Sequence, residues 1–186
     1  MDSKPQVISS TPRFSGRVFR VRTDEVRYSD GATHAVDVVE HGASAAIIAA
    51  TKENEIVLVR QYRHAIGREL WEVPAGRAEA GEDVAQSAAR ELTEETGYIA
   101  ASLRPLGGVA MTPGFCDEII YFFYATELSA GGQSLDDDER ITVESYSLER
   151  AQRLVETGQI ADAKTIIALQ WFAGNRAELV GTRADN

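Results

Sequence analysis

The chain has 186 residues, of which 44% are hydrophobic and 26% charged, and its 29 acidic and 19 basic residues give a formal net charge of −10. This length suits one domain, or one domain with a small appendage. No apolar run approaches the roughly 20 residues of a membrane span, the first residues lack signal-peptide features, and the single cysteine, Cys116, cannot form an internal disulfide. We therefore expect a soluble, cytoplasmic protein with no membrane partner. The acidity argues against nucleic acid as a partner but allows a small anion held through arginines and metal ions.

Strand patterns dominate the first half of the chain, after about a dozen polar residues that we expect to be frayed. The turn Ser29-Asp30-Gly31 predicts a hairpin, and Pro74 ends a short strand. The predicted strands cover residues 18–28, 33–40, 45–50, 56–60, 71–73, 103–109, 119–126 and 141–146.

Three segments predict helices: residues 83–96, a segment capped by Ser147 with Gly158 past its end, and a last helix from Asp162 to about Ala173. In the first of them an apolar stripe is expected to dock the helix on a sheet. The order of strands, one central helix and two closing helices predicts an α+β or α/β layered sandwich, a mixed sheet with helices on its faces. The stripe consists of Ala85, Ala89 and Leu92.

The first helix carries charged residues at fixed spacing. Gly76 is followed after five residues by Glu82, and after seven more by Arg90-Glu91-Leu92-Thr93-Glu94-Glu95-Thr96-Gly97-Tyr98. On a helix Glu91 and Glu95 lie one turn apart on the same face, with Glu94 one step around. Like charges so close together need a cation, and the one guanidinium of Arg90 cannot neutralise four carboxylates. The pattern therefore predicts a divalent cation, and Mg²⁺ suits carboxylate oxygens together with phosphate oxygens and water.

An exposed acidic helix is the plainer interpretation of a glutamate-rich segment. Seven fixed residues at fixed offsets would match by chance at a given position with a probability on the order of 10⁻⁹. The spacing therefore favours a catalytic motif.

The segment 76–98 resembles the Nudix box, Gly-x5-Glu-x7-Arg-Glu-U-x-Glu-Glu-x-Gly-U, where U is a bulky apolar residue, and Tyr98 departs from it only in being aromatic. Segments 59–63, 70–76, 112–115 and 162–165 resemble the ADP-ribose pyrophosphatase branch of this family, in which a proline lies sixteen positions after the last box glycine, as Pro113 does here. The resemblance implies a Nudix-type α/β/α sandwich with a mixed sheet. It also implies an N-terminal β subdomain, residues 1–42, that dimerises and contributes to the substrate site, and a hydrolase domain, residues 43–186.

The implied activity is hydrolysis of the diphosphate bond of a nucleoside diphosphate sugar, most simply ADP-ribose to AMP and ribose 5-phosphate. Mg²⁺ is the implied cofactor, with Mn²⁺ as a substitute. The catalytic base is expected on an acidic loop, at Glu139 or alternatively at Asp136, Asp137 or Asp138. The implied metal ligands are Ala75 through its carbonyl, Glu91, Glu95 and Glu94, and the implied catalytic residues are Glu139, Glu94, Arg90 and Glu82.

Substrate contacts are expected from Arg63 to the diphosphate and from Glu72 near the terminal ribose. Phe19 and Tyr28 are candidates for stacking on the base, although aromatic residues of a hairpin are more often core. The resemblance adds Pro113 and Gly114 to the substrate site and implies a homodimer. Structural roles are expected for His34, His41, His64 and Cys116, which lack metal-ligand spacing or a catalytic partner.

Other functions remain open at this point. Within the same enzyme class, GDP-mannose or another nucleoside diphosphate derivative could be the substrate. From another class, the chain could be a Nudix-fold sensor that binds ADP-ribose without cleaving it, although such sensors carry a broken box and a fused DNA-binding region. Isomerase chemistry on the same scaffold would need a cysteine and histidine arrangement that the sequence does not show.

Overall fold

The computed structural model describes residues 4–135 and 140–174. Its elements pack as two units. The N-terminal unit is the chain up to Ala43 together with Ala110–Ile119, and the main unit is Ser44–Val109 with the chain from Ile120 onwards.

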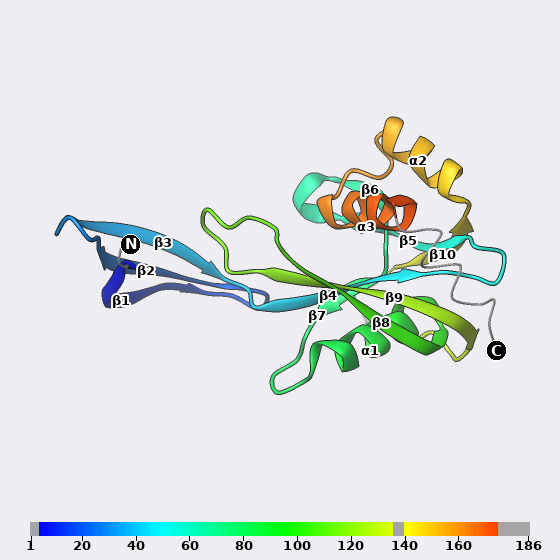
Figure 1. Cartoon of the computed structure of the whole chain (residues 1–186), viewed down its shortest axis with the longest axis horizontal. Helices are drawn as coiled ribbons and strands as arrows, with labels where there is room; N and C mark the ends of the chain where they lie inside the picture. The colour runs from blue at the N-terminus through cyan, green and yellow to red at the C-terminus, as the bar shows by residue number, and fades with distance from the viewer. Residues whose placement is uncertain (1–3, 136–139, 175–186) are drawn as a thin grey trace. The chain divides into compact units, whose positions relative to one another are not determined.

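The N-terminal unit is built on an antiparallel sheet in the order β1-β2-β3, with β1 at Gln6–Ser15, β2 at Arg20–Arg27 and β3 at Thr33–Glu40 (Figure 1). The prediction that the first dozen residues are frayed is wrong from Gln6 onwards, because β1 pairs with β2 along its length. Every residue of β1 is exposed. A strand that buries neither face needs no alternation of apolar and polar residues, so hydropathy does not predict a strand there.

The segment Ala110–Ile119 is fastened to the end of β3. The backbone N–H of Val39 donates to the carbonyl of Phe115 (2.7 Å), and the carboxylate of Asp117 accepts from the backbone N–H groups of His41 (2.7 Å) and Gly42 (3.1 Å). Burial by itself would raise the pKa of Asp117, but these two donors hold it below its ordinary value. The segment that contains Pro113 therefore folds as part of the N-terminal unit.

The main unit layers helices on both sides of two sheets, ordered β7-β4-β9-β8 and β10-β5-β6. Helix α1 lies on one side of these sheets, while α2 and α3 lie on the other (Figure 1). The predicted α+β layered sandwich is confirmed, although β7 and the short 3-10 helix η1 were not predicted. The bounds are Ala43–Ala49 (β4), Ile56–Arg63 (β5), His64–Ile66 (η1), Arg68–Glu72 (β6), Ala75–Arg77 (β7), Val84–Thr96 (α1), Tyr98–Ala110 (β8), Ile119–Ala130 (β9), Thr142–Tyr146 (β10), Leu148–Glu156 (α2) and Ala163–Gly174 (α3).

The core of the main unit forms where α1 packs on β4, β5 and β9. Ala88 and Leu92 of α1 are fully buried against Ile47, Val57 and Phe123. The predicted docking stripe is therefore correct only at Leu92, since Ala85 and Ala89 are exposed and Ala88 takes their place. Three alanines occur in the first half of this helix, and the hydropathy of such small side chains does not show which of them faces the core. Among the described helices, none is long and apolar enough to cross a membrane.

Candidate active site

Helix α1 begins and ends where its sequence predicts. Asp83 is the N-cap, accepting a hydrogen bond from the backbone N–H of Ala85 (2.8 Å), and Gln86 completes a capping box by accepting from the Asp83 N–H (3.2 Å). Gly97 ends the helix in the left-handed region, with φ 73°. Both ends are therefore fixed by local hydrogen bonds, and the glutamates between them project from a defined element.

Arg90 is the centre of a charged cluster on this helix. Its guanidinium donates to both carboxylate oxygens of Glu82 (3.0 Å each), to Oε1 of Glu91 (2.9 Å) and to Oε2 of Glu94 (2.8 Å). The bonds to Glu82 make the largest contribution to the raised pKa of Arg90, and the same bonds, with the N–H of Glu79, lower the pKa of Glu82. Arg90 thus holds the side chains of three glutamates together, as a planar fork of five donors allows.

Glu91 and Glu95 face strand β7. Glu95 is 3% exposed, and its Oε2 accepts from the backbone N–H of Ala75 (2.9 Å). Gly76 lies so close to Glu91 that a Cβ atom at position 76 would be 2.0 Å from the Glu91 carboxylate. The structure therefore brings together the residues that were predicted as metal ligands: Ala75, Glu91 and Glu95, with Glu94 beside them.

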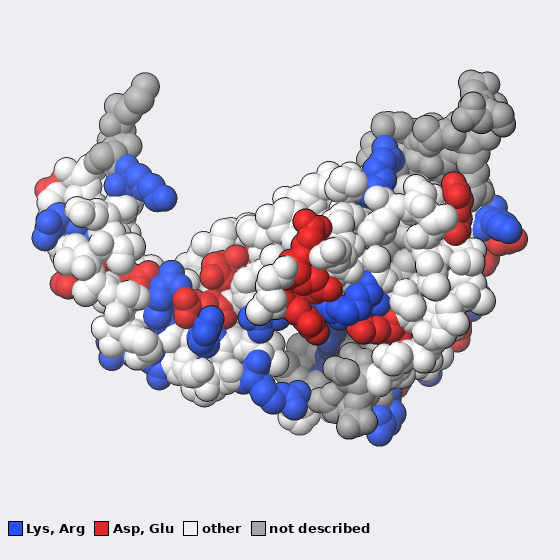
Figure 2. Space-filling view, turned by 90° about the horizontal axis from the view of Figure 1, so that it is seen from below, with Lys and Arg blue, Asp and Glu red and all other residues white. Residues whose placement is uncertain are grey.

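The oxygen ligands gathered here fit a divalent cation, because carboxylate oxygens are the ligands that hard cations prefer, and the missing side chain at Gly76 lets the Glu91 carboxylate lie directly against the backbone of β7. Within residues 4–135 and 140–174, no three His, Cys, Asp or Glu side chains already stand in a metal-binding arrangement. In the arrangement described, Glu91 and Glu94 are instead paired with Arg90. On the face of the molecule that α1 occupies, acidic and basic side chains accordingly lie side by side (Figure 2).

A second charged cluster lies at the ends of β5 and β6. Arg63 donates through Nε to Oε1 of Glu72 (2.7 Å) and through Nη2 to Oε2 (2.6 Å). Glu72 also contacts Nζ of Lys164, which donates to Asp162 (3.0 Å). Burial would raise the pKa of Glu72, but the hydrogen bonds from Arg63 and the charge of Lys164 hold it below its ordinary value. The predicted substrate residues Arg63 and Glu72 therefore contact each other.

The partner of Glu72 in α3, Lys164, and the residue that holds this lysine, Asp162, were not predicted from the sequence. Lys164 and Asp162 were noted only as part of a family segment, because they lie 92 and 90 positions from Glu72 in the chain. The available signal was a lone glutamate between apolar residues, Leu-Trp-Glu-Val, since a carboxylate buried in such a strand needs a cationic partner. The sequence could have shown that a partner exists but not which residue it is.

Four predicted substrate residues, Phe19, Tyr28, Pro113 and Gly114, belong to the N-terminal unit. Phe19 is 41% exposed beside the ring of Phe14, and Tyr28 is 39% exposed beside His34. Neither aromatic residue is buried in a core, so the interpretation of Phe19 and Tyr28 as core residues of the hairpin is wrong. Their role in stacking stays a prediction.

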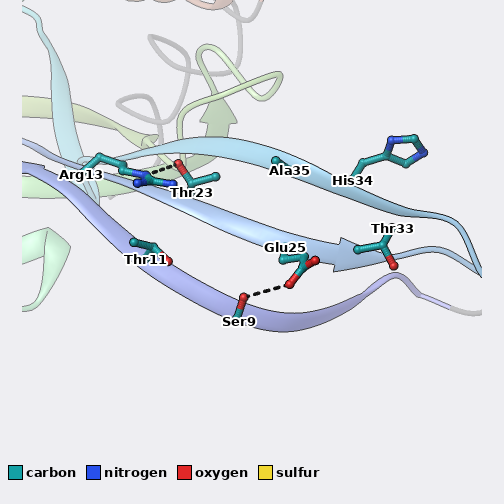
Figure 3. A pocket seen from close by; sticks show the side chains of 8 residues that line it. All are labelled: Ser9, Thr11, Arg13, Thr23, Glu25, Thr33, His34 and Ala35. Atoms are coloured by element: carbon teal, nitrogen blue, oxygen red, sulfur yellow. Dashed lines mark hydrogen bonds between the residues drawn. The ribbon is translucent and has the colours of Figure 1, made fainter.

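The sheet of the N-terminal unit also bears a polar hollow of about 270 Å³. Two hydrogen bonds join side chains of its lining: Arg13 donates to Thr23 (2.9 Å) and Ser9 donates to Glu25 (3.3 Å) (Figure 3). Among the residues that line the hollow, Glu25 alone carries a carboxylate. The hollow is lined by Ser9, Thr11, Arg13, Thr23, Glu25, Thr33, His34 and Ala35.

The predicted catalytic base, Glu139, and its alternatives Asp136, Asp137 and Asp138 lie outside the described residues. The base therefore stays a prediction from the sequence.

Comparison with known proteins places these features in one family. The model of the NUDIX domain matches residues 40–169. The chain is 39% identical to the methanol dehydrogenase activator of Bacillus methanolicus and 38% identical to the ADP-ribose pyrophosphatase of Bacillus subtilis, in each case over 90% of this chain and 91% of the relative. It is 34% identical to the GDP-mannose pyrophosphatase of Citrobacter koseri, over 75% of this chain and 78% of the relative.

A solved structure described as an ADP compounds hydrolase shares the fold, with a TM-score of 0.81 over 93% of this chain and 96% of that one. Its sequence identity of 22% supports the fold alone. The chain belongs to the NUDIX family. Its class of activity is that of a pyrophosphohydrolase, as the predicted box implied.

Proposed function

We propose that this enzyme hydrolyses ADP-ribose to AMP and ribose 5-phosphate. The observation that carries the proposal is the convergence of Glu91 and Glu95 on the Ala75–Gly76 backbone, which gathers the donors for a cation that binds diphosphate. The choice of ADP-ribose is supported by Pro113 at its family position and by the name of the Bacillus subtilis relative. Relatives of comparable sequence identity are named as a methanol dehydrogenase activator and as GDP-mannose pyrophosphatases, so sequence similarity alone does not identify the substrate.

The side chains of Glu91 and Glu95, with the carbonyl of Ala75, would hold Mg²⁺, and Glu94 would be a further ligand or lie behind the first ones. A divalent cation supplies an activated water and neutralises charge on the leaving phosphate. Arg90 orients Glu91 and Glu94 through the bonds described above. Arg63 contacts the diphosphate with the donors that it does not give to Glu72.

Glu139 is the proposed base, with Asp136, Asp137 and Asp138 as alternatives. Glu139→Gln should lose most turnover and keep the thermal stability of the parent, because the amide keeps the size of the side chain but cannot take a proton. Asp136→Asn, Asp137→Asn and Asp138→Asn are the matched controls, each removing one charge from the same loop. Near-normal kcat in Glu139→Gln would eliminate Glu139, and loss of kcat in one of the three controls would name the base instead.

The substrate is tested by incubating the purified protein and Mg²⁺ with ADP-ribose, GDP-mannose, NADH and diadenosine compounds and identifying the product pair. AMP and ribose 5-phosphate from ADP-ribose, at the highest kcat/KM of the series, would support the proposal. Preferred cleavage of GDP-mannose would select the alternative that the Citrobacter koseri relative suggests. Tight binding of ADP-ribose without cleavage of any compound would show a sensor. Repeating the assay with Mn²⁺ and with a chelator identifies the ion.

We further propose a homodimer formed through the N-terminal β subdomain, residues 1–42. The support is the exposed apolar surface of β1, where Val7 is 55% and Phe14 is 53% exposed, since surface of this kind marks an interface. Native mass spectrometry should show a dimer that Phe14→Asp weakens, while Ile99→Asp, at a side chain 49% exposed on β8, leaves it intact. A monomeric parent protein would refute the dimer. Cytoplasmic location and the absence of a nucleic-acid partner stay predictions from the sequence.

A further inference from the structure

The first turn of helix α3 reaches the cluster formed by Arg63 and Glu72. Lys164 is one residue inside the helix, its side chain is 13% exposed, and its Nζ contacts Oε2 of Glu72. Asp162 holds this lysine from the other side (3.0 Å) and caps the helix by accepting from the N–H of Thr165 (2.9 Å). The Lys164 amine is therefore held in place at the N-terminal end of a helix, unlike the amine of a lysine on the exposed surface.

The backbone N–H groups of the two residues that flank Glu72 are also hydrogen-bonded, one to α3 and one to a residue that precedes α3. The N–H of Val73 donates to Oγ1 of Thr165 (2.9 Å), which is fully buried, and the N–H of Trp71 donates to the carbonyl of Gln159 (2.9 Å). Glu72 lies between these two bonds. These two bonds hold the backbone of Glu72 in place without Lys164. The lysine therefore affects the Glu72 side chain and not its backbone.

Glu72 is 1% exposed and accepts from three donors, two on Arg63 and one on Lys164. Arg63 gives two of its five N–H groups to Glu72, and its side chain is 41% exposed. A guanidinium held at two points by one carboxylate has a fixed plane, so its other donors have a fixed direction. The orientation of Arg63 therefore depends on the orientation of Glu72.

We propose that Lys164 is a positioning residue, which locks the Glu72 carboxylate in the orientation that aims the outward donors of Arg63 at the substrate diphosphate. The proposal rests on the assignment of Arg63 to the diphosphate made above. Lys164 itself is 13% exposed and both of its described partners are carboxylates, so it acts through Glu72 and does not bind the substrate.

The charges explain why the lysine is needed. Arg63 and Lys164 balance Glu72 and Asp162 one to one. Removing Lys164 leaves Glu72 and Asp162 to share the guanidinium of Arg63, whose charge already interacts with the carboxylates of Glu95 and Asp162. Arg63 would then divide its donors between the two acids, and its bidentate contact with Glu72 would loosen.

The test compares Lys164→Met, Lys164→Arg and Lys52→Met, the last of which removes the same charge from an exposed turn. On the nucleoside diphosphate sugar that the parent cleaves best, Lys164→Met should raise KM roughly tenfold, the effect of one charge-assisted hydrogen bond, with kcat changed little. Lys164→Arg should restore most of the loss, and Lys52→Met should match the parent. Equal KM values in the parent and Lys164→Met would overturn the proposal.

A double-mutant cycle separates positioning from general damage. If Lys164 acts through Arg63, Lys164→Met should add little in an Arg63→Gln background, because the residue that it positions is gone. Independent, additive losses would overturn the proposal.

A spectroscopic measurement makes the result independent of the proposed activity. The Nε–H group of Arg63, identified as the ¹⁵N resonance that Arg63→Gln removes, should be protected from solvent exchange in the parent and exchange faster in Lys164→Met. Unchanged exchange would refute the positioning role even in an enzyme that cleaves nothing tested, whereas faster exchange there would leave the positioning role standing and only the proposed function refuted.

Discussion

Gly76 and Glu91 approach each other so closely that no side chain fits between them, since a Cβ atom on residue 76 would lie 2.0 Å from Cδ and Oε1 of Glu91. The glycine is therefore required by space and not by a positive φ. The first residue of the family box and the helix glutamate that follows it by fifteen positions form one local structure.

Gly76→Ala should lower kcat/KM roughly a hundredfold, because moving a group of the active site by about 1 Å can cost that much. The concentration of Mg²⁺ needed for half-maximal activity should rise as well, because Glu91 must swing away. Gly132→Ala is the matched control, since a Cβ atom there meets nothing within 4 Å. A Gly76→Ala enzyme with the Mg²⁺ response of the parent would show that Glu91 does not hold the cation.

Arg90→Lys should impair the enzyme although it keeps the charge. One ammonium cannot reach Glu82, Glu91 and Glu94 as the guanidinium does. We expect a fall of about tenfold or more in kcat/KM and a lower melting temperature. Arg153→Lys, at an exposed position of α2, is the control and should behave as the parent does. Unaltered kinetics in Arg90→Lys would mean that the charge alone suffices.

Glu72→Gln should make stability depend less on pH. The pKa of Glu72 is lowered in the folded protein, so its ionised form stabilises the fold above its pKa in the unfolded chain, about 4.3, and this stabilisation is lost as the pH falls through the folded value. Urea unfolding at neutral pH should give a free energy lower by about 3 kcal/mol in Glu72→Gln, and the difference should shrink in acid.

The control for this experiment is Glu69→Gln, because the Glu69 side chain is 59% exposed and 3.8 Å from Arg60, a surface pair of small energetic value. If the difference in the free energy of unfolding between the parent and Glu72→Gln stays constant down to acidic pH, Glu72 does not stabilise the fold through its ionised carboxylate.

Asp83→Ala should lower the free energy of unfolding by about 1 kcal/mol, because it removes the N-cap of α1. Activity measured well below the melting temperature should stay near that of the parent, since the glutamates sit toward the other end of the helix. Asp83→Asn, which keeps an accepting oxygen, should recover most of the stability. A large loss of kcat in Asp83→Ala with normal stability would give Asp83 a role that the structure does not show.

The active-site helix was predictable because its information is local. The spacing from Glu91 to Glu95, the cap at Asp83 and the end at Gly97 depend only on helical geometry and neighbouring hydrogen bonds. The contact of Glu72 with Lys164 was not predictable, because which distant cation meets a buried carboxylate depends on how α3 packs. Strand β1 was missed for another reason, since pairing by backbone bonds with both faces exposed leaves no mark in hydropathy.

The tie between Asp117 and the residues that follow β3 bears on how this protein can be recombined. The carboxylate of Asp117 accepts hydrogen bonds from the backbone N–H groups of His41 and Gly42, which precede it by 76 and 75 positions in the chain. A chimera that takes its N-terminal segment from a relative should therefore also take the segment Ala110–Ile119 from the same parent. If only one of the two segments is exchanged, the loop that carries Asp117 and the residues that follow β3 come from different proteins, and their hydrogen bonds need not form.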